Sequence, residues 1–263
     1  MAWIKRHLLA FAALVVLAYM LVPNVVVAVF SFNDPVGRYN YNWEKFSIEA
    51  WTNPCGAQGI CDAVGLSLEI GLIASFVATV LGTMIAFALG RYRFRGRSGT
   101  NLLIFMPMAT PEVVMGSSLL TLFLMMGLPV GELAILIAHI MFCISFVVVA
   151  VKARVATLDP RLEEAAADLG ANPLQTFLRV TLPLAAPGIA AGALLAFSLS
   201  FDDYIITNFN ASPSSITFPM YVWGAAQRGA PVQVNVIGTI MFLVALVAVI
   251  IGQVLSNRRN RQV

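Results

Sequence analysis

Six stretches of the sequence are almost continuously apolar, and each is long enough to cross a membrane. They cover roughly residues 8–30, 66–89, 102–126, 133–151, 184–206 and 232–255. About 20 apolar residues in helical conformation span the hydrocarbon core of a bilayer. The pattern therefore predicts an all-α, polytopic integral membrane protein with six transmembrane helices. We expect one transmembrane domain over residues 1–263, with a first helix at 8–30 and core helices over about 66–255.

The third apolar stretch is interrupted by the segment "MPMATPEVV". Pro107 and Pro111 are expected to kink or break this helix, because proline removes a backbone donor and clashes with the preceding turn. A break inside a membrane frees backbone carbonyls, which must line a cavity or find partners within the protein. Glu112 follows directly after the second proline.

The first apolar stretch follows "MAWIKRH" and runs without a charge from Leu8 to Phe32. A secretory signal peptide has an apolar region of about 7–15 residues followed by a cleavage site of the A-x-A kind. This run is longer, and no such site follows it. We therefore expect a retained first membrane helix.

Composition supports the same class. The chain is 59% hydrophobic and 11% charged, and its mean hydropathy is +0.85, whereas soluble domains carry about 25% charged residues. The net charge of +3 is small, and no nucleic-acid partner is expected. Placing the N-terminus in the cytoplasm leaves only Arg38, Lys45 and Arg228 of the 16 Lys and Arg residues outside. This asymmetry favours six helices with both termini cytoplasmic.

The segments between the apolar stretches differ in length and chemistry. Residues 31–63 and 207–231 are predicted to lie outside, where Trp43 and Trp51 are expected as interfacial anchors and "MYVWGAAQ" as a short helix at the membrane surface. Cys55 and Cys61, in "CGAQGIC", lie in the first of these segments. A disulfide between them is plausible as a structural clip, and two cysteines alone are too few for a zinc site. Cys143 is read as a packing residue, and no metal site is expected.

The largest cytoplasmic segment covers residues 152–183. Asp159 suits an N-cap and Pro160 a first helical position, and Gly170 is a natural stop, so a short helix is predicted over about 160–169. Asn172 and Pro173 begin a second short helix, "PLQTFLRVT". Read on composition alone this is an ordinary cytoplasmic loop, although three successive alanines from Ala165 leave a smooth surface that another protein could approach closely.

The spacing within this segment resembles the pattern E-A-A-x3-G-x9-I-x-L-P of the membrane permease subunits of bacterial ABC importers. The matching residues are Glu164, Ala165, Ala166, Gly170, Leu182 and Pro183, with Val180 where the pattern has isoleucine. The resemblance implies a type I importer permease fold, similar to that of the methionine importer. It also implies that the first short helix of the coupling segment, residues 159–183, docks on a cytoplasmic ATPase. Glu164 would support the loop or contact the ATPase, and Gly170 would permit the turn.

The same resemblance implies the partners. The chain has no G-x-x-x-x-G-K-[ST] phosphate-binding loop, so ATP and Mg would be used by two separate ATPase subunits, and no cofactor is expected on this chain. The other expected partners are a homologous permease subunit in a heterodimer, an extracytoplasmic substrate-binding protein and the lipid bilayer. The expected location is the bacterial cytoplasmic membrane.

The resemblance extends further, to the spermidine/putrescine permeases and especially to the second permease subunit of such systems. The stretches that carry it are "RYRFRG", "PEVVMGSSLL", "EAAADLGANP" and "FSLSFDDYIITNF". Permeases for other small solutes, such as ferric ion or thiamine, share much of this framework. The resemblance implies polyamine import into the cytoplasm.

A polyamine is a flexible cation with amines several ångströms apart, so its pathway needs separated carboxylates with hydroxyls or aromatic rings. The candidates are Asp202, Asp203, Glu112, Ser198, Ser200 and Trp51. Acids inside a membrane span are functional candidates because they are costly to insert. Each also has a structural reading: the acids can cap or pair within the bundle, and Trp51 can anchor the interface. His139 is read as a buried packing residue, Glu69 as a solvated boundary residue, and Gly188 with Gly192 as a close-packing motif.

Two other functions remain open on the sequence. An ion-coupled secondary carrier would use Asp202, Asp203 and Glu112 as its coupling sites, but it leaves the E-A-A segment without a role. A scaffold subunit without transport activity is the other alternative.

Overall fold

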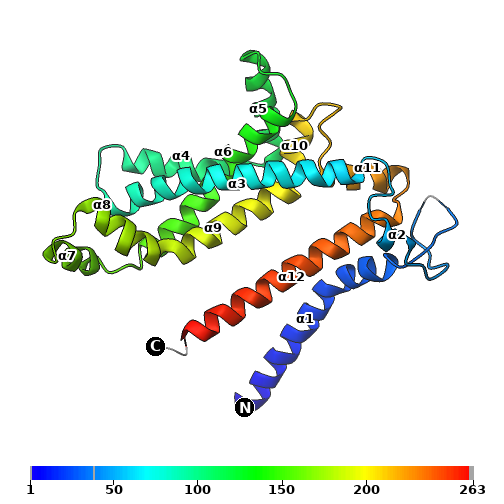
Figure 1. The fold of residues 1–263 in the computed structure, drawn as a ribbon, viewed down its shortest axis with the longest axis horizontal. Coiled ribbons are helices and arrows are strands. Elements are labelled where there is room, and N and C mark those ends of the chain that lie inside the picture. The colour runs from blue at the N-terminus through cyan, green and yellow to red at the C-terminus, as the bar shows by residue number, and fades with distance from the viewer. Residues whose placement is uncertain (1, 38, 261–263) are drawn as a thin grey trace. The chain divides into compact units, whose positions relative to one another are not determined.

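The computed structural model describes residues 2–37 and 39–260, and within the helices it leaves the side chains of residues 2–6, 249, 251 and 253–260 undescribed. Arg38 and Arg261, which entered the charge pattern, lie outside the described residues. The described chain is built almost entirely from helices (Figure 1) and divides into two compact units, residues 1–62 with 221–263, and residues 63–220. The all-α prediction is confirmed.

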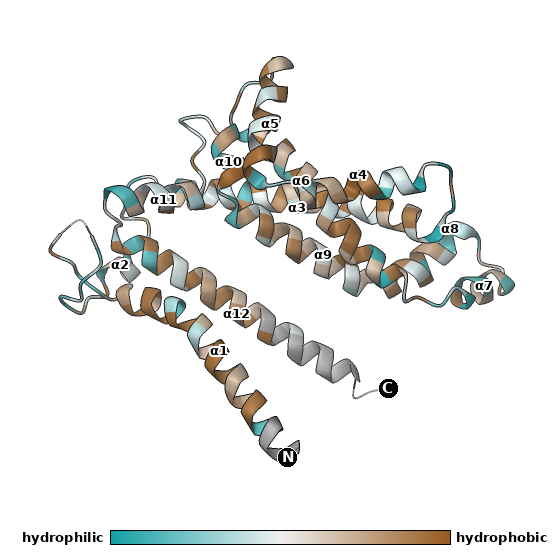
Figure 2. Ribbon diagram, turned by 180° about the vertical axis from the view of Figure 1, so that it is seen from behind, coloured by the Kyte–Doolittle hydropathy of each residue, from teal (hydrophilic) through white to brown (hydrophobic). Residues whose placement is uncertain are grey.

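The first unit is a helical pair with an irregular loop. Helix α1 (Ala2–Phe30) packs beside α12 (Val232–Asn260), and the short α2 (Glu49–Thr52) lies against α12. Helix α1 is hydrophobic along most of its described length (Figure 2), and its described apolar side chains are largely exposed. A helix that is apolar all round needs a nonpolar environment, so this helix suits a membrane.

The loop after α1 is held by side-chain amides rather than by regular structure. Asn33 is buried, and its Nδ2 donates to Asn40 Oδ1 at 2.6 Å and to the Asn42 carbonyl at 2.7 Å. Its Oδ1 accepts from the Glu44 backbone N–H at 2.8 Å. One amide therefore satisfies several backbone and side-chain groups that would otherwise be left unpaired.

The second unit is built around three long helices. These are α3 (Ile60–Arg91), whose first turn still belongs to the first unit, α6 (Glu132–Val155) and α9 (Leu182–Asp202). Helices α6 and α9 pack closely because glycines face the partner helix. A Cβ on Gly188 would collide with the Cβ and Cγ of Arg154, and one on Gly192 would lie 3.5 Å from the Val147 Cα. The close-packing interpretation of Gly188 and Gly192 is confirmed.

The third apolar stretch is broken, as the prolines predicted. Helix α4 (Arg97–Ala109) ends just before Pro111, and α5 (Glu112–Met125) leaves it at 108°. Pro107 lies inside α4 and does not end it. Helix α5 packs against the short α10 (Ile205–Asn210), where a Cβ on Gly116 would lie 2.8 Å from Phe209 Cδ2.

Two predictions around the fifth apolar stretch were wrong. The segment "PLQTFLRVT" is not a separate short helix, because α8 (Pro173–Thr176), the π-helical turn η1 (Phe177–Thr181) and α9 form one continuous helix of 30 residues. The Leu182 N–H donates to the Phe177 carbonyl, five residues back. Proline cannot continue a regular helical ladder, and a π turn immediately before Pro183 accommodates it. The helix also ends at Asp202 rather than near Ile206, because Asp203 is extended.

The short helix predicted from "MYVWGAAQ" is present as α11 (Phe218–Arg228), whose first backbone N–H, on Phe218, donates to Ser67 Oγ of α3 at 2.8 Å. In the described part of the chain four helices are long and apolar enough to cross a membrane, or five if α4 and α5 count as one bent span. The apolar part of α12 covers Val232–Ala248. The membrane class is supported, and the count of six stays a prediction.

Candidate functional site

The two adjacent aspartates at the end of α9 point into different surroundings. Asp202 is the last residue of α9 and its side chain is exposed. The side chain of Asp203, the next residue, is only 5% exposed. The chain leaves the helical conformation at Asp203, whose backbone is extended, and this change of direction separates the two side chains.

Asp203 belongs to a cluster of buried polar side chains, which we call the His139 cluster: His139, Ser200, Asp203 and Thr207. His139 Nδ1 lies 2.7 Å from Ser200 Oγ, and His139 Nε2 lies 3.0 Å from Thr207 Oγ1 and 3.3 Å from Asp203 Oδ2. Both ring nitrogens are therefore engaged. His139 is buried, as the packing interpretation required, and it also joins α6 to the end of α9 and to α10.

The Asp203 carboxylate also holds the start of α10. It accepts from the Ile206 N–H at 3.3 Å, from the Thr207 N–H at 2.7 Å and from Thr207 Oγ1 at 2.8 Å. The first N–H groups of a helix have no partner inside the helix, and an aspartate before the helix commonly supplies one. The cap could have been predicted from the sequence, because an acid stands just before the helical stretch "IITN". Nothing in the local sequence pointed to His139.

The other predicted pathway residues of the second unit fall into two groups. Ser198 is exposed one helical turn before Asp202, so the two share an accessible face of α9. Ser200 is 4% exposed and is bound to His139. Glu112 is exposed at the first position of α5, and Glu69 is exposed on α3. Asp202, Ser198 and Glu112 are thus available to a ligand, whereas Ser200 and Asp203 are engaged inside the bundle.

Trp51 belongs to the first unit and is half-buried. Its indole Nε1 donates to Ser31 Oγ at 3.1 Å, and its ring stacks on Phe32 with centroids 5.2 Å apart. These contacts hold the external loop together. A role of Trp51 in the pathway stays a prediction.

The first half of the coupling segment, up to Gly170, has the local structure that its sequence predicted. Helix α7 (Arg161–Asp168) begins where the Arg161 N–H donates to Asp159 Oδ1 at 3.0 Å. It ends at Gly170, whose φ of +85° lies in the left-handed region. The Ala171 N–H donates to the Ala166 carbonyl and the Gly170 N–H to the Ala167 carbonyl. This pair of hydrogen bonds is a Schellman motif, in which glycine is preferred at the left-handed position.

The next helix is also capped by its own sequence. The Gln175 N–H donates to Asn172 Oδ1 at 2.8 Å, and the Asn172 N–H donates to Gln175 Oε1 at 3.0 Å. This capping box satisfies donors at both ends of the first turn. The turn between α7 and α8 is therefore well defined.

Glu163, which the sequence patterns did not single out, attaches the coupling segment to the bundle. Its Oε1 lies 3.0 Å from Arg91 Nη2 at the end of α3 and accepts from Thr181 Oγ1 of η1 at 3.0 Å. Glu164, Ala165 and Gly170 are exposed, and Ala166 is half-buried. Farther along, Leu182 is half-buried and Pro183 is exposed. The adjacent glutamates Glu163 and Glu164 thus divide between an internal contact and an open surface.

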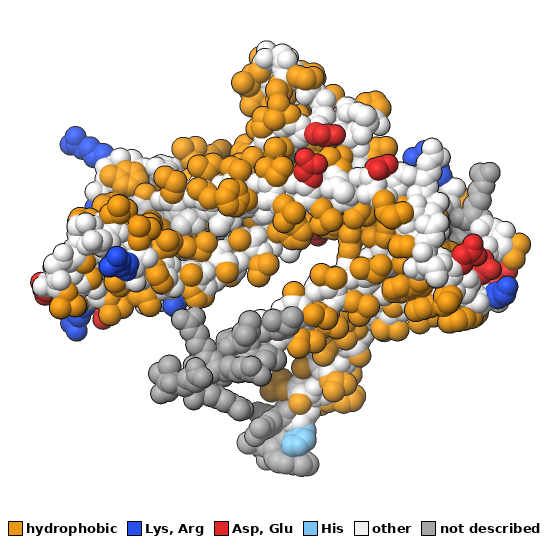
Figure 3. Space-filling view, viewed as in Figure 1, with side chains coloured by type: hydrophobic (Ala, Val, Ile, Leu, Met, Phe, Trp, Pro, Cys, Tyr) orange, Lys and Arg blue, Asp and Glu red, His pale blue; other side chains and the backbone are white. Residues whose placement is uncertain are grey.

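Charges of opposite sign gather at different ends of the second unit. Lys and Arg side chains, with a few acids, lie at the end that carries α7 and α8, and acidic side chains lie beside α5 and α10 (Figure 3). The exposed arginines near α7 and α8 include Arg93, Arg95, Arg161 and Arg179.

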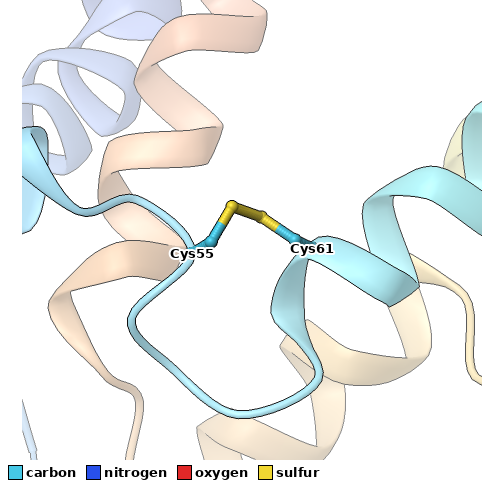
Figure 4. Close-up of a disulfide and its surroundings, with 2 residues drawn as sticks. All are labelled: Cys55 and Cys61. Atoms are coloured by element: carbon cyan, nitrogen blue, oxygen red, sulfur yellow. A yellow bond between two sulfur atoms is a disulfide. The ribbon is translucent and has the colours of Figure 1, made fainter.

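The two cysteines that lie between α2 and the first turn of α3 are bonded to each other (Figure 4). The disulfide links Cys55, in the loop after α2, to Cys61, in the first turn of α3, and the two Cα atoms are 5.4 Å apart. Cys143 is a free, buried thiol in α6.

Comparisons with known proteins match the chain along most of its length. Residues 78–262 match the family described as binding-protein-dependent transport system inner membrane component. The chain is 35% identical over 244 residues to the spermidine/putrescine transport system permease protein PotC of Escherichia coli K12, covering 93% of this chain and 92% of the relative. It is 36% identical over 251 residues to the putrescine transport system permease protein PotI of the same strain, covering 93% and 89%.

Solved structures agree on the fold. A bacterial ABC transporter that imports the acidic polysaccharide alginate matches with a TM-score of 0.66 at 19% identity, over 95% of this chain and 96% of that one. The MetNI methionine ABC transporter matches with a TM-score of 0.58 at 18% identity, over 76% and 93%. The broken apolar span, the capped coupling segment and these likenesses agree, and the chain belongs to the family of binding-protein-dependent transport system inner membrane components.

Proposed function

We propose that this chain is a permease subunit of an ATP-driven importer that carries polyamines such as spermidine and putrescine into the cytoplasm. The observation that carries the proposal is the identity of about a third of the residues with two polyamine permeases over 93% of the chain. The same length of chain covers the broken span, the acidic end of α9 and the coupling segment.

The exposed acids fit a cationic substrate. Asp202 and Glu112 are both exposed, and each lies at the end of an apolar helix. A carboxylate accepts hydrogen bonds from an ammonium group and offsets its charge. Ser198 adds a hydroxyl on the same face of α9 as Asp202. Carboxylates on separate helices match a ligand whose amines are spaced along a flexible chain.

The coupling segment fits an ATPase partner. Helix α7 presents Glu164 and Ala165 on an exposed surface, and its attachment at Glu163 reaches both α3 and η1. A push on α7 would therefore be transmitted to two helices of the bundle. The sequence has no phosphate-binding loop of its own, so we assign ATP hydrolysis to two separate ATPase subunits. The family description, a binding-protein-dependent transport system, supports an extracytoplasmic binding protein, and a second permease subunit completes the proposed assembly.

The proposed orientation places both termini and α7 in the cytoplasm. The basic residues at the end of the second unit that carries α7 favour this side. The disulfide between Cys55 and Cys61 favours the opposite side for the external loop, because disulfides persist in oxidising compartments.

Uptake by the assembled importer in proteoliposomes tests the proposal. We expect ATP-dependent accumulation of labelled spermidine that excess unlabelled putrescine reduces and excess thiamine or ferric ion does not. Competition by thiamine or ferric ion, with none by putrescine, would contradict polyamine specificity. Uptake that survives removal of the ATPase and collapses with an uncoupler would instead support an ion-coupled carrier.

A further inference from the structure

Asp203 has little capacity left to bind a substrate. Its two carboxylate oxygens already accept from two backbone N–H groups and the Thr207 hydroxyl, and Oδ2 faces His139 Nε2 at 3.3 Å. A carboxylate offers about four acceptor positions. The side chain is also only 5% exposed. An incoming ammonium group would have to displace partners that the helix start needs.

His139 completes the arrangement from another helix. Its Nδ1 meets Ser200 on the α9 side of the break, and its Nε2 meets Thr207 on the α10 side. The His139 side chain is 1% exposed and lies about two turns from the start of α6. One imidazole therefore joins α6 to both helices that flank the break at Asp203. Breaking such a buried network leaves unpaired polar groups, which is costly.

We propose that His139 and Asp203 form a positioning pair that fixes the break between α9 and α10, and that Asp202 is the aspartate whose charge faces the transported cation. The pair holds the end of α9 so that Asp202 points outward beside Ser198. This division of roles rests on the proposed function only for the identity of the cation.

A thiol reporter at Ser198 tests which aspartate faces the pathway. Ser198→Cys places a thiol one helical turn from Asp202, and it would be the only reactive thiol among the described residues, since Cys55 and Cys61 are bonded and Cys143 is buried. The measurement is the ratio of labelling rates with a cationic and an anionic thiosulfonate of similar size, on the assembled complex in detergent.

Asp202→Asn should lower this ratio roughly fivefold, because a nearby negative charge attracts the cationic reagent and repels the anionic one. Asp203→Asn should leave the ratio within about twofold, because the Asp203 carboxylate is buried and already accepts hydrogen bonds from two backbone N–H groups and the Thr207 hydroxyl. An equal fall in both variants, or a fall in Asp203→Asn alone, would overturn the proposal. The readout needs no transport, so it stands even if the substrate is another cation.

Uptake then tests the positioning role. Asp203→Asn should keep at least half of wild-type uptake, because its amide oxygen, placed where Oδ2 lies, can still accept from the Thr207 N–H and face His139 Nε2. The variant would then lose only the longer contact from the Ile206 N–H. Asp203→Ala and His139→Ala should each lower uptake at least tenfold and change the reporter's labelling rate, and the double variant should be no worse than either. Asn208→Ala, exposed on the same α10, is the matched control.

Two outcomes would contradict the pair. Asp203→Asn as inactive as Asp203→Ala, in a complex that still assembles, would show that the charge itself is required. Additive losses in the double variant would show that His139 and Asp203 act independently. Absence of polyamine uptake by the wild-type importer would instead contradict the proposed function and leave the reporter result intact.

Discussion

Neighbouring identical side chains in this chain do different work, because one side of a helix end or loop is buried and the other is open. Asp202 is exposed and Asp203 caps α10. Glu163 pairs with Arg91, and Glu164 faces outward. The cost of burying an unpaired charge explains why Asp203 and Glu163, the more enclosed member of each pair, have specific partners.

Glu163→Gln tests the attachment of the coupling segment. The variant weakens the contacts with Arg91 Nη2 and Thr181 Oγ1. Because both partners of the ion pair are partly exposed, at 20% and 33%, its loss should cost at most about 1 kcal/mol of stability. Uptake should fall severalfold while ATPase binding stays unchanged, because α7 is then less firmly attached to α3 and η1 and transmits less of its movement to them. Uptake and copurification of the ATPase measure the two effects, and unchanged uptake would argue against a transmitting role.

Gly170→Ala tests the turn after α7. Nothing lies within 4 Å of an added Cβ, so the change is purely conformational at φ +85°. A non-glycine residue in the left-handed conformation costs roughly 1–2 kcal/mol. We expect this cost to lower the midpoint of thermal unfolding or to weaken the coupling to the ATPase. Gly99→Ala in α4 has equal space without the positive φ, so it should be neutral or slightly stabilising. Equal behaviour of the two variants would contradict this account.

At the scale of elements, two prolines and a few glycines decide where helices break and how closely they approach. Pro111 separates α4 from α5, and the π turn before Pro183 keeps α8 and α9 in one helix. Gly188 and Gly192 then let α9 lie against α6, the helix that carries His139. Close packing of these two helices is therefore a condition for the His139 cluster.

Gly188→Ala tests this close approach. The added methyl group would meet the Cβ and Cγ of Arg154, whose Nε donates to the Leu184 carbonyl at 3.0 Å. Overpacking of this kind costs typically 1–3 kcal/mol, which should lower the thermal unfolding midpoint of the purified subunit or complex. Gly65→Ala, in α3 with nothing within 4 Å of the new Cβ, is the matched control and should be close to wild type. A wild-type midpoint for Gly188→Ala would show that α9 can shift without loss.

At the scale of the whole molecule, one continuous helix connects the proposed substrate end of the second unit to the proposed ATPase-facing end. The helix from Pro173 to Asp202 begins inside the coupling segment, directly after the turn that follows α7, and ends at the exposed aspartate. A displacement of its α7 end therefore has a direct route to Asp202. This connection is how an ATPase docked on one side could change access to a cation on the other.

Glu164→Lys tests the partner-facing end. Glu164 is exposed and makes no internal contact on which the fold depends, so the variant should assemble with the second permease and keep its unfolding midpoint. We expect it to lose most ATPase copurification and ATP-dependent uptake, because the reversed charge disrupts a complementary surface. Retained ATPase binding with normal uptake would place the docking surface elsewhere.

Features that arise from local chemistry can be predicted from short stretches of the sequence. The length of apolar runs predicted membrane helices, Pro111 predicted the break, and Asp159 with Gly170 predicted the start and end of α7. Such signals lie within a few residues of the structure that they control, because helix caps and breaks depend on neighbouring backbone groups. The E-A-A spacing, likewise local, predicted the family that the comparisons show.

Which acid faces outward and which is held inside depends on how distant helices pack together. His139 lies 61 residues from Ser200 and 68 from Thr207 along the chain, and Arg91 is as distant from Glu163. Partners so far apart are set by helix packing, through glycines at the α6–α9 contact and the π turn before Pro183. Two adjacent aspartates look equivalent in a sequence. They differ in the structure because Asp203 lies beside the buried His139 and accepts from the first N–H groups of α10, whereas Asp202 is exposed.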